Sequence, residues 1–388
     1  RERVIKGIFS MGASSLLSMV LSFLSVTIAA RIIPQEDFGV YFLLIAIVYL
    51  LEVVGDVGLR LSAAKFVASA SSAQEQQVIV KNLLTFRLLS ILAISLLAFA
   101  AKPLLILLYP SKLISSLFIF APALFAVELG DQTLASIMQG FHLFKKMAIV
   151  QTLTSALNLG LTLLFILKLN MAVQGFIMAS ILSLLVSLVT RLFIIPAPKA
   201  LALDRALLHR IMTFGLPLQG NDLLTFAFDR MNVLILGVLM GPEQIAYLEM
   251  AGKIPNYFRR LYTSLNSVYF PNMSELFARQ QNQEAEKVLN NFLRLATFVT
   301  TFFALAAILF RHNLITLIFS EKYLPSADAL GLLMVGVAIS VASTILDTAL
   351  IAAGRPAYLL IINLVTTVVS VSGNLGLIPI FGFMGAVY

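Results

Sequence analysis

The stretch Gly241–Leu276, GPEQIAYLEMAGKIPNYFRRLYTSLNSVYFPNMSEL, combines the length of a membrane helix with an unusual number of charges. Residues 245–270 exceed the roughly 20 residues that one bilayer crossing requires. An ionisable group near the bilayer centre costs roughly 2.5–3.5 kcal/mol, so its charged face should meet protein or a water-filled cavity. Spacings of three and four define that face, which consists of Glu249, Lys253, Asn256, Arg260 and Ser264.

The charges of this stretch have two interpretations. Glu249 and Lys253 are four residues apart, so they can neutralise each other as an ion pair within the helix. Arg259 and Arg260 have no acidic residue within one turn on either side, so pairing within the helix does not account for them. The stretch therefore predicts a cationic face with four candidate substrate contacts, namely Lys253, Asn256, Arg259 and Arg260.

The composition of the whole chain indicates an integral membrane protein. Its 388 residues are 60% hydrophobic and 12% charged, with a mean hydropathy of +0.96, whereas soluble domains carry about 25% charged residues. The net charge of +8 is spread over short loops, so nucleic acid is not expected as a partner. With no cysteine and three scattered histidines, we expect no metal site, no disulfide and no cofactor.

Eleven apolar segments are long enough to be spans, and short polar connections separate them. They lie at about 8–30, 39–59, 83–101, 113–137, 148–168, 173–195, 212–239, 245–270, 292–318, 327–352 and 357–380. A twelfth begins at 385–388, so we expect the chain to be a fragment that lacks its C-terminal end. Sixteen of the 27 Lys and Arg lie on the same side of the membrane as the N-terminus, and six lie on the opposite side. Because positive charges accumulate on the cytoplasmic side, this excess predicts a cytoplasmic N-terminus.

The two halves of the chain repeat a local pattern. The turn after the first span is IIPQEDFGVY (32–41), and the turn after the seventh is MGPEQIAY (240–247). Both follow an inside-to-outside crossing, as in transporters with parallel repeats and a midplane site between two lobes. We therefore predict an all-α protein with two pseudo-symmetric six-helix lobes around a central cavity. The N-terminal lobe spans 1–200, and the C-terminal lobe, 201–388, holds five helices and the start of a sixth.

These segments also carry a family resemblance. AARIIPQEDFGVYFLL (29–44), GDVGLRLSAAKFVAS (55–69) and FGLPLQ (214–219) resemble bacterial polysaccharide flippases of the O-antigen type. That family belongs to the multidrug/oligosaccharidyl-lipid/polysaccharide (MOP) superfamily. The resemblance implies that helices one, two, seven and eight line the cavity. It also implies a polyprenyl-diphosphate-linked oligosaccharide as substrate, and a role in lipopolysaccharide or other surface polysaccharide biosynthesis. The expected location is the cytoplasmic membrane of a bacterium or archaeon, beside a polymerase and glycosyltransferases.

The chemistry of a diphosphate headgroup selects further candidate residues. Arginine holds phosphate oxygens with two parallel hydrogen bonds and stays charged, so cations within or beside spans are candidate substrate contacts. Besides the cations of the opening stretch, these are Arg31, Arg87 and Arg230. No nucleotide-binding GxxxxGK[ST] loop occurs, so we expect transport to be coupled to H⁺ or Na⁺. The candidate ion-coupling carboxylates are Asp56, Glu128, Asp131, Asp222 and Asp229.

A hydroxyl stripe on the first span has two interpretations. Ser14, Ser18, Ser22 and Ser25 share one face, which suits either close helix packing or contact with sugar.

Three other functions are considered. A lipid II flippase would have the same chemistry. A multidrug cation antiporter is disfavoured because the first span has no acid and the face of the eighth is basic. A membrane-bound polymerase or ligase is disfavoured because the outer loops are short and no acid–histidine pair is present. We therefore expect a transporter and not an enzyme.

Overall fold

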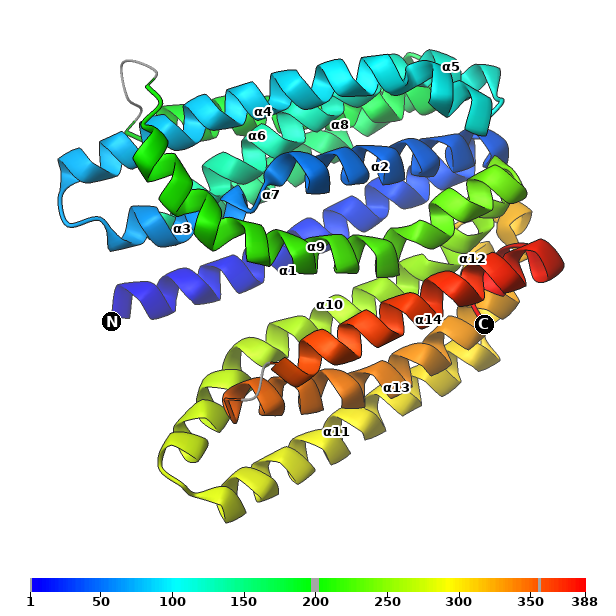
Figure 1. Ribbon diagram of the computed structural model, residues 1–388. Helices are drawn as coiled ribbons and strands as arrows, with labels where there is room; N and C mark the ends of the chain where they lie inside the picture. The colour runs from blue at the N-terminus through cyan, green and yellow to red at the C-terminus, as the bar shows by residue number, and fades with distance from the viewer. Residues whose placement is uncertain (1, 197–201, 355–356) are drawn as a thin grey trace. The chain divides into compact units, whose positions relative to one another are not determined.

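The computed structural model describes residues 2–196, 202–354 and 357–388, and throughout this part the regular structure is helical (Figure 1). Nine helical segments there are long and apolar enough to cross a membrane. The chain is therefore a multi-pass membrane protein, and the predicted all-α class is confirmed. The predicted spans 212–239 and 245–270 lie in long helices that are not among these nine, so their crossing stays a prediction.

The chain divides into two compact units, Arg1–Arg230 and Met231–Tyr388. The division falls inside a helix, whereas the predicted lobe boundary lies at residue 200. Residues 197–201 are outside the described residues, and the lobe boundary stays a prediction.

Unit 1 is built from long helices that pack side by side. Helix α1 lies along α7, α6 lies against α2, α3, α4 and α8, and α7 packs on α8. The elements are α1 (Glu2–Ile32), α2 (Gln35–Asp56), α3 (Leu59–Ser69), α4 (Ala73–Leu108), α5 (Lys112–Leu117), η1 (Phe118–Phe120), α6 (Ala121–Gly140), α7 (Phe144–Thr162), η2 (Leu163–Lys168), α8 (Ala172–Ile194) and α9 (Arg205–Leu239), which continues into unit 2.

Local sequence signals set several of these helix ends. Ser72 precedes α4, and its hydroxyl oxygen accepts the Glu75 N–H at 3.1 Å. The Glu75 carboxylate in turn accepts the Ser71 N–H at 2.7 Å. Asp204 starts α9 in the same way, because its carboxylate accepts the N–H groups of Ala206 and Leu207. These side chains satisfy backbone donors that the first turn of a helix leaves without a partner.

Helix α9 is anchored to unit 1 through an apolar core. Leu59 and Phe66 of α3, Leu83 of α4, Ile137 of α6 and Ile211 of α9 are all buried in one cluster. Burial of each such side chain contributes about 1.5–3 kcal/mol in an aqueous setting. The first half of α9 therefore belongs to the same body as α3, α4 and α6.

Unit 2 is organised around α13, which packs between α10 and α11 (Figure 1). Tyr269 of α10, Ala296 of α11 and Val341 of α13 are buried in its core. The turn Gly382–Ala386 is a 3-10 helix, so a twelfth span beginning at 385 stays a prediction. The elements are α10 (Pro242–Ala278), α11 (Asn282–Leu309), α12 (Arg311–Ile318), η3 (Glu321–Tyr323), α13 (Ser326–Ala352), α14 (Ala357–Phe381) and η4 (Gly382–Ala386).

Candidate functional site

The GDVG segment breaks the second span into α2 and α3. Val57 and Gly58 both adopt left-handed backbone conformations, with φ of 51° and 70°. A Cβ on Gly58 would overlap the backbone of Gly215 on α9, so the two helices meet here backbone to backbone. A glycine is required at this contact both for its φ and for its lack of a side chain.

Gln219 of α9 satisfies the backbone groups that this break exposes. Its side-chain oxygen accepts the Gly58 N–H at 2.8 Å, and its side-chain nitrogen donates to the Val53 carbonyl. Gln219 is buried, so each group would be costly to leave without a partner. The role of Gln219 was not predicted, because nothing in FGLPLQ alone indicates which backbone it meets.

Arg87 is the hub of a buried polar network in unit 1. Its guanidinium donates to Asp56 Oδ1 at 2.6 Å, to the Gly55 carbonyl at 2.9 Å and to Thr133 Oγ1 at 2.6 Å. The side chain is 3% exposed and joins α4 to α2 and α6. The ion pair gives both residues a structural role as an alternative to the predicted ones. Arg87 as a substrate contact and Asp56 as an ion coupler stay predictions.

A second buried ion pair joins α6 to α8. Asp131 Oδ1 accepts from Arg191 Nε at 2.7 Å and from the Ser187 hydroxyl at 2.6 Å. Arg191 was counted from the sequence among the inner-side charges, yet it is buried within the last turn of α8. As with Asp56, the proposed coupling role of Asp131 competes with a structural one.

Glu52 and Glu128 form a carboxyl pair between α2 and α6. They lie within side-chain hydrogen-bonding reach of each other, and Gln132 Nε2 donates to Glu52 Oε2 at 3.1 Å. Glu52 is 5% exposed and Glu128 is half-buried. Among the described residues, neither carboxyl group forms an ion pair, unlike Asp56 and Asp131. Glu128 was predicted as an ion coupler, whereas its partner Glu52 was not among the predicted coupling residues.

The remaining candidates in unit 1 are closer to its surface. Asp222 of α9 pairs with Arg60 of α3 at 3.2 Å. Asp229 is exposed and Arg230 half-buried on the same helix, and Arg31 is exposed at the end of α1. The structure does not bring Arg31 into the Arg87 network.

Helix α10 carries the predicted cationic face in unit 2. Glu249 and Lys253 form the ion pair within the helix at 3.0 Å, which confirms that interpretation of the two charges. Asn256, Arg259 and Arg260 are exposed, and the Arg260 guanidinium carbon lies 5.9 Å from the centre of the Tyr257 ring. The side chain of Ser264 lies outside the described residues.

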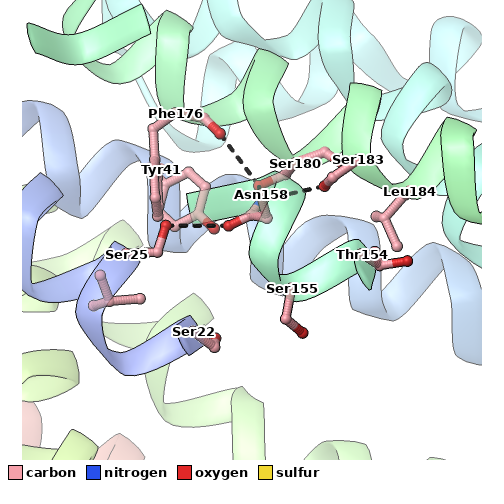
Figure 2. A pocket seen from close by; sticks show the side chains of 11 residues that line it. Ser22, Ser25, Tyr41, Thr154, Ser155, Asn158, Phe176, Ser180, Ser183 and Leu184 are labelled. Atoms are coloured by element: carbon pink, nitrogen blue, oxygen red, sulfur yellow. Dashed lines mark hydrogen bonds between the residues drawn. The ribbon is translucent and has the colours of Figure 1, made fainter. Parts of the chain in front are cut away.

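A cavity of about 230 Å³, lined by both polar and apolar side chains, lies within unit 1, between α1, α2, α7 and α8 (Figure 2). Asn158 of α7 is at the centre of its wall: the side-chain oxygen accepts from the Ser25 hydroxyl at 3.1 Å, and the nitrogen donates to Ser183 at 3.3 Å. Tyr41 and Phe176 form an edge-to-face aromatic pair on one side. Polar residues near the midpoints of apolar spans are the sequence signal that could have revealed this cavity.

The serines along the first span take part both in helix packing and in lining the cavity. Ser14 donates to the Ala148 carbonyl at 2.7 Å, and Ser25 contacts Thr162 at 2.9 Å, so both hold α1 against α7. Ser22 is exposed and, like Ser25, lines the cavity. The close-packing interpretation is thus confirmed for Ser14 and Ser25, and contact with sugar stays a prediction. In the described part of the chain, no cluster of three or more His, Asp or Glu side chains could hold a metal.

Comparisons with solved structures define the fold as that of MOP superfamily transporters. The lipid II flippase MurJ, in an inward closed conformation, matches with a TM-score of 0.79 at 16% identity, covering 97% of this chain and 83% of that one. An inward-facing multidrug resistance transporter of the MATE family matches with a TM-score of 0.77 at 16% identity, covering 95% and 89%. A MOP superfamily transporter from Pyrococcus furiosus gives 0.63 at 17% identity, covering 99% and 90%.

The sequence match identifies a narrower family than the fold comparison does. Residues 4–277 match the polysaccharide biosynthesis protein family, and the chain belongs to that family. A search of curated proteins gives no significant match. The predicted family resemblance is therefore confirmed.

Proposed function

We propose that the chain is a flippase that moves a polyprenyl-diphosphate-linked oligosaccharide from the inner to the outer leaflet of the cytoplasmic membrane. Membership of the polysaccharide biosynthesis family supports a glycan substrate. The MOP transporter fold supports translocation by alternating access rather than chemical conversion. The N-terminus lies on the cytoplasmic side, and the polymerase and glycosyltransferases that act on the same glycan are the expected partners.

The exposed cationic face of α10 is the observation that carries this proposal. Arg259, Arg260 and Asn256 are exposed on α10, and we propose that they contact the diphosphate. Arginine stays charged throughout a crossing and holds a diphosphate with a planar pair of donors. Lys253, whose charge Glu249 already balances at 3.0 Å, is assigned the lesser role.

The Glu52–Glu128 pair is the best-supported candidate for ion coupling. Two neighbouring carboxyl groups repel each other when both are ionised, so uptake of a proton by the pair would relieve that repulsion. Asp56 and Asp131 are instead neutralised by Arg87 and Arg191. Proton exchange at Glu52 and Glu128, which join α2 to α6, would alter the contact between these helices. We propose H⁺ as the coupling ion of this pair, with Na⁺ as the alternative.

Lipid II is the alternative substrate within the same class. The fold match to MurJ supports it, and its headgroup also carries a diphosphate and sugars. A multidrug antiport function draws support from the MATE matches, but the cationic face of α10 would repel cationic drugs. The family match favours a polysaccharide precursor over both.

Reconstitution tests the proposal against the transporter and enzyme alternatives together. Vesicles would carry a fluorescent undecaprenyl-diphosphate-linked glycan in the inner leaflet, with and without the full protein. We expect the glycan to become accessible to an external lectin only with protein, and its mass to stay unchanged. A change of mass would point to a polymerase or ligase, and equal accessibility without protein would remove the flippase proposal.

A further inference from the structure

The cavity of unit 1 lies near the middle of the predicted spans, a position that suits the substrate site of a transporter. Ser22, Asn158 and Ser183 each lie close to the midpoint of a candidate span, in Met11–Ile32, Phe144–Lys168 and Ala172–Ile194 respectively. Three polar walls therefore meet near the middle of the bilayer, where exposed polar groups are tolerated only around a cavity or a protein contact. Substrate sites of transporters with internal repeats are found at this depth.

The hydrogen bonds of the side chains that line the cavity show which donors and acceptors remain for a ligand. The hydroxyl hydrogens of Thr154, Ser155, Ser180 and Ser183 are all donated to backbone carbonyls, at 2.8, 3.1, 3.2 and 3.0 Å. Asn158 uses its nitrogen on Ser183 at 3.3 Å and on Ser180 at 3.5 Å. What remains toward the cavity is mostly hydroxyl lone pairs, because each hydroxyl has two and donates only one hydrogen. The wall therefore suits a ligand that brings several hydroxyl or amide hydrogens.

The charge of the wall narrows the ligand class further. Among the residues that the structure describes, no Asp, Glu, Lys or Arg lines the cavity. An anion would meet lone pairs and a bare cation would lack a counter-charge, so a neutral ligand fits best. The volume of about 230 Å³ is below the roughly 300–1,000 Å³ of drug-sized sites, which restricts the occupant to about one ring. The aromatic pair Tyr41–Phe176, at 4.9 Å between centroids, adds an apolar wall for the face of such a ring.

We infer that this cavity is a subsite for one uncharged sugar ring of the transported glycan (Figure 2). The inference rests on the proposed flippase function and adds a site that reads the sugar rather than the diphosphate. Ser22 and Ser155 contact the ring, and Asn158 holds the surrounding hydroxyls in place. The subsite thus recognises the sugar of the transported molecule and not its diphosphate.

Variants that fill the cavity test the inference. Ser22→Leu and Ser155→Leu occupy the space, Ser22→Ala removes one hydroxyl without filling it, and Thr190→Leu is the matched control. Thr190 lies on α8, bonds its own helix at 2.7 Å and does not line the cavity. Binding by the purified full protein is measured to undecaprenyl diphosphate alone and to the same lipid carrying one glucose, galactose or N-acetylglucosamine.

The outcomes separate this inference from the proposed function. We expect the wild type to bind at least one sugar-bearing lipid about tenfold more tightly than the bare lipid, as two or so neutral hydrogen bonds would give. Both leucine variants should lose that preference while binding the bare lipid as Thr190→Leu does. No preference in the wild type, or a full preference in both leucine variants, would overturn the subsite. No binding of any diphosphate lipid would instead remove the proposed function.

Discussion

Arg87 either stabilises the fold through its buried network or contacts the substrate, and the variant Arg87→Met tests which of these roles it has. Methionine retains most of the side-chain volume but removes all three donated hydrogen bonds, to Asp56, Gly55 and Thr133. Asp56 would be left as a buried charge without its arginine, a loss that costs about 3–5 kcal/mol in buried pairs. The Gly55 carbonyl would lose a donor as well, so we expect the free energy of unfolding to fall by at least about 3 kcal/mol.

Denaturant titration of the detergent-solubilised protein measures this change. The double variant Asp56→Asn with Arg87→Met removes the uncompensated charge, so we expect it to recover at least half of the lost stability. The substrate-contact interpretation predicts the opposite pattern. If Arg87→Met unfolds like the wild type and only loses lipid binding, the structural reasoning is wrong.

The other predictions concern coupling, binding and the α2–α3 break. Glu52→Gln should still bind the glycan lipid but lose the acceleration that an imposed pH gradient gives, whereas the exposed Glu286→Gln should keep it; an unchanged response of Glu52→Gln would remove the pair from coupling. Arg260→Ala should weaken lipid binding about ten- to a hundredfold, the worth of one charge-assisted contact, without lowering the melting temperature; Arg260→Lys should lie between, and a folding defect would favour a structural role. Gly58→Ala should lower the unfolding midpoint because its φ is +70° and the new Cβ meets Gly215, whereas Gly160→Ala, with open space around it, should raise it slightly; equal shifts would refute the close contact.

Features that depend on one helix were predictable from the sequence. The apolar segments gave most of the spans, and a spacing of four residues predicted the Glu249–Lys253 pair that the structure contains. The cationic face of α10 follows from the same periodicity. Local capping residues such as Asp204 are readable for the same reason, since their partners lie within one turn.

Features that depend on how helices pack were not predictable. Arg87 meets Asp56, Arg191 meets Asp131, and Gln219 meets Gly58, at separations of 31, 60 and 161 residues. Periodicity places each side chain on a face but does not give the register between two packed helices. Charge counting therefore assigned Arg191 to the inner side, although it is bonded to a carboxylate within the bundle.

The central claim is that the chain moves a diphosphate-linked glycan rather than a cationic drug, and one vesicle experiment addresses it directly. Proteoliposomes containing the full protein would hold both a fluorescent undecaprenyl-diphosphate glycan and tetraphenylphosphonium, with a pH gradient imposed across the membrane. The account predicts protein-dependent transfer of the glycan lipid to the opposite leaflet, slowed in Arg260→Ala, with no movement of the cation beyond that in protein-free vesicles. Protein-dependent movement of the cation with a stationary glycan lipid would contradict it.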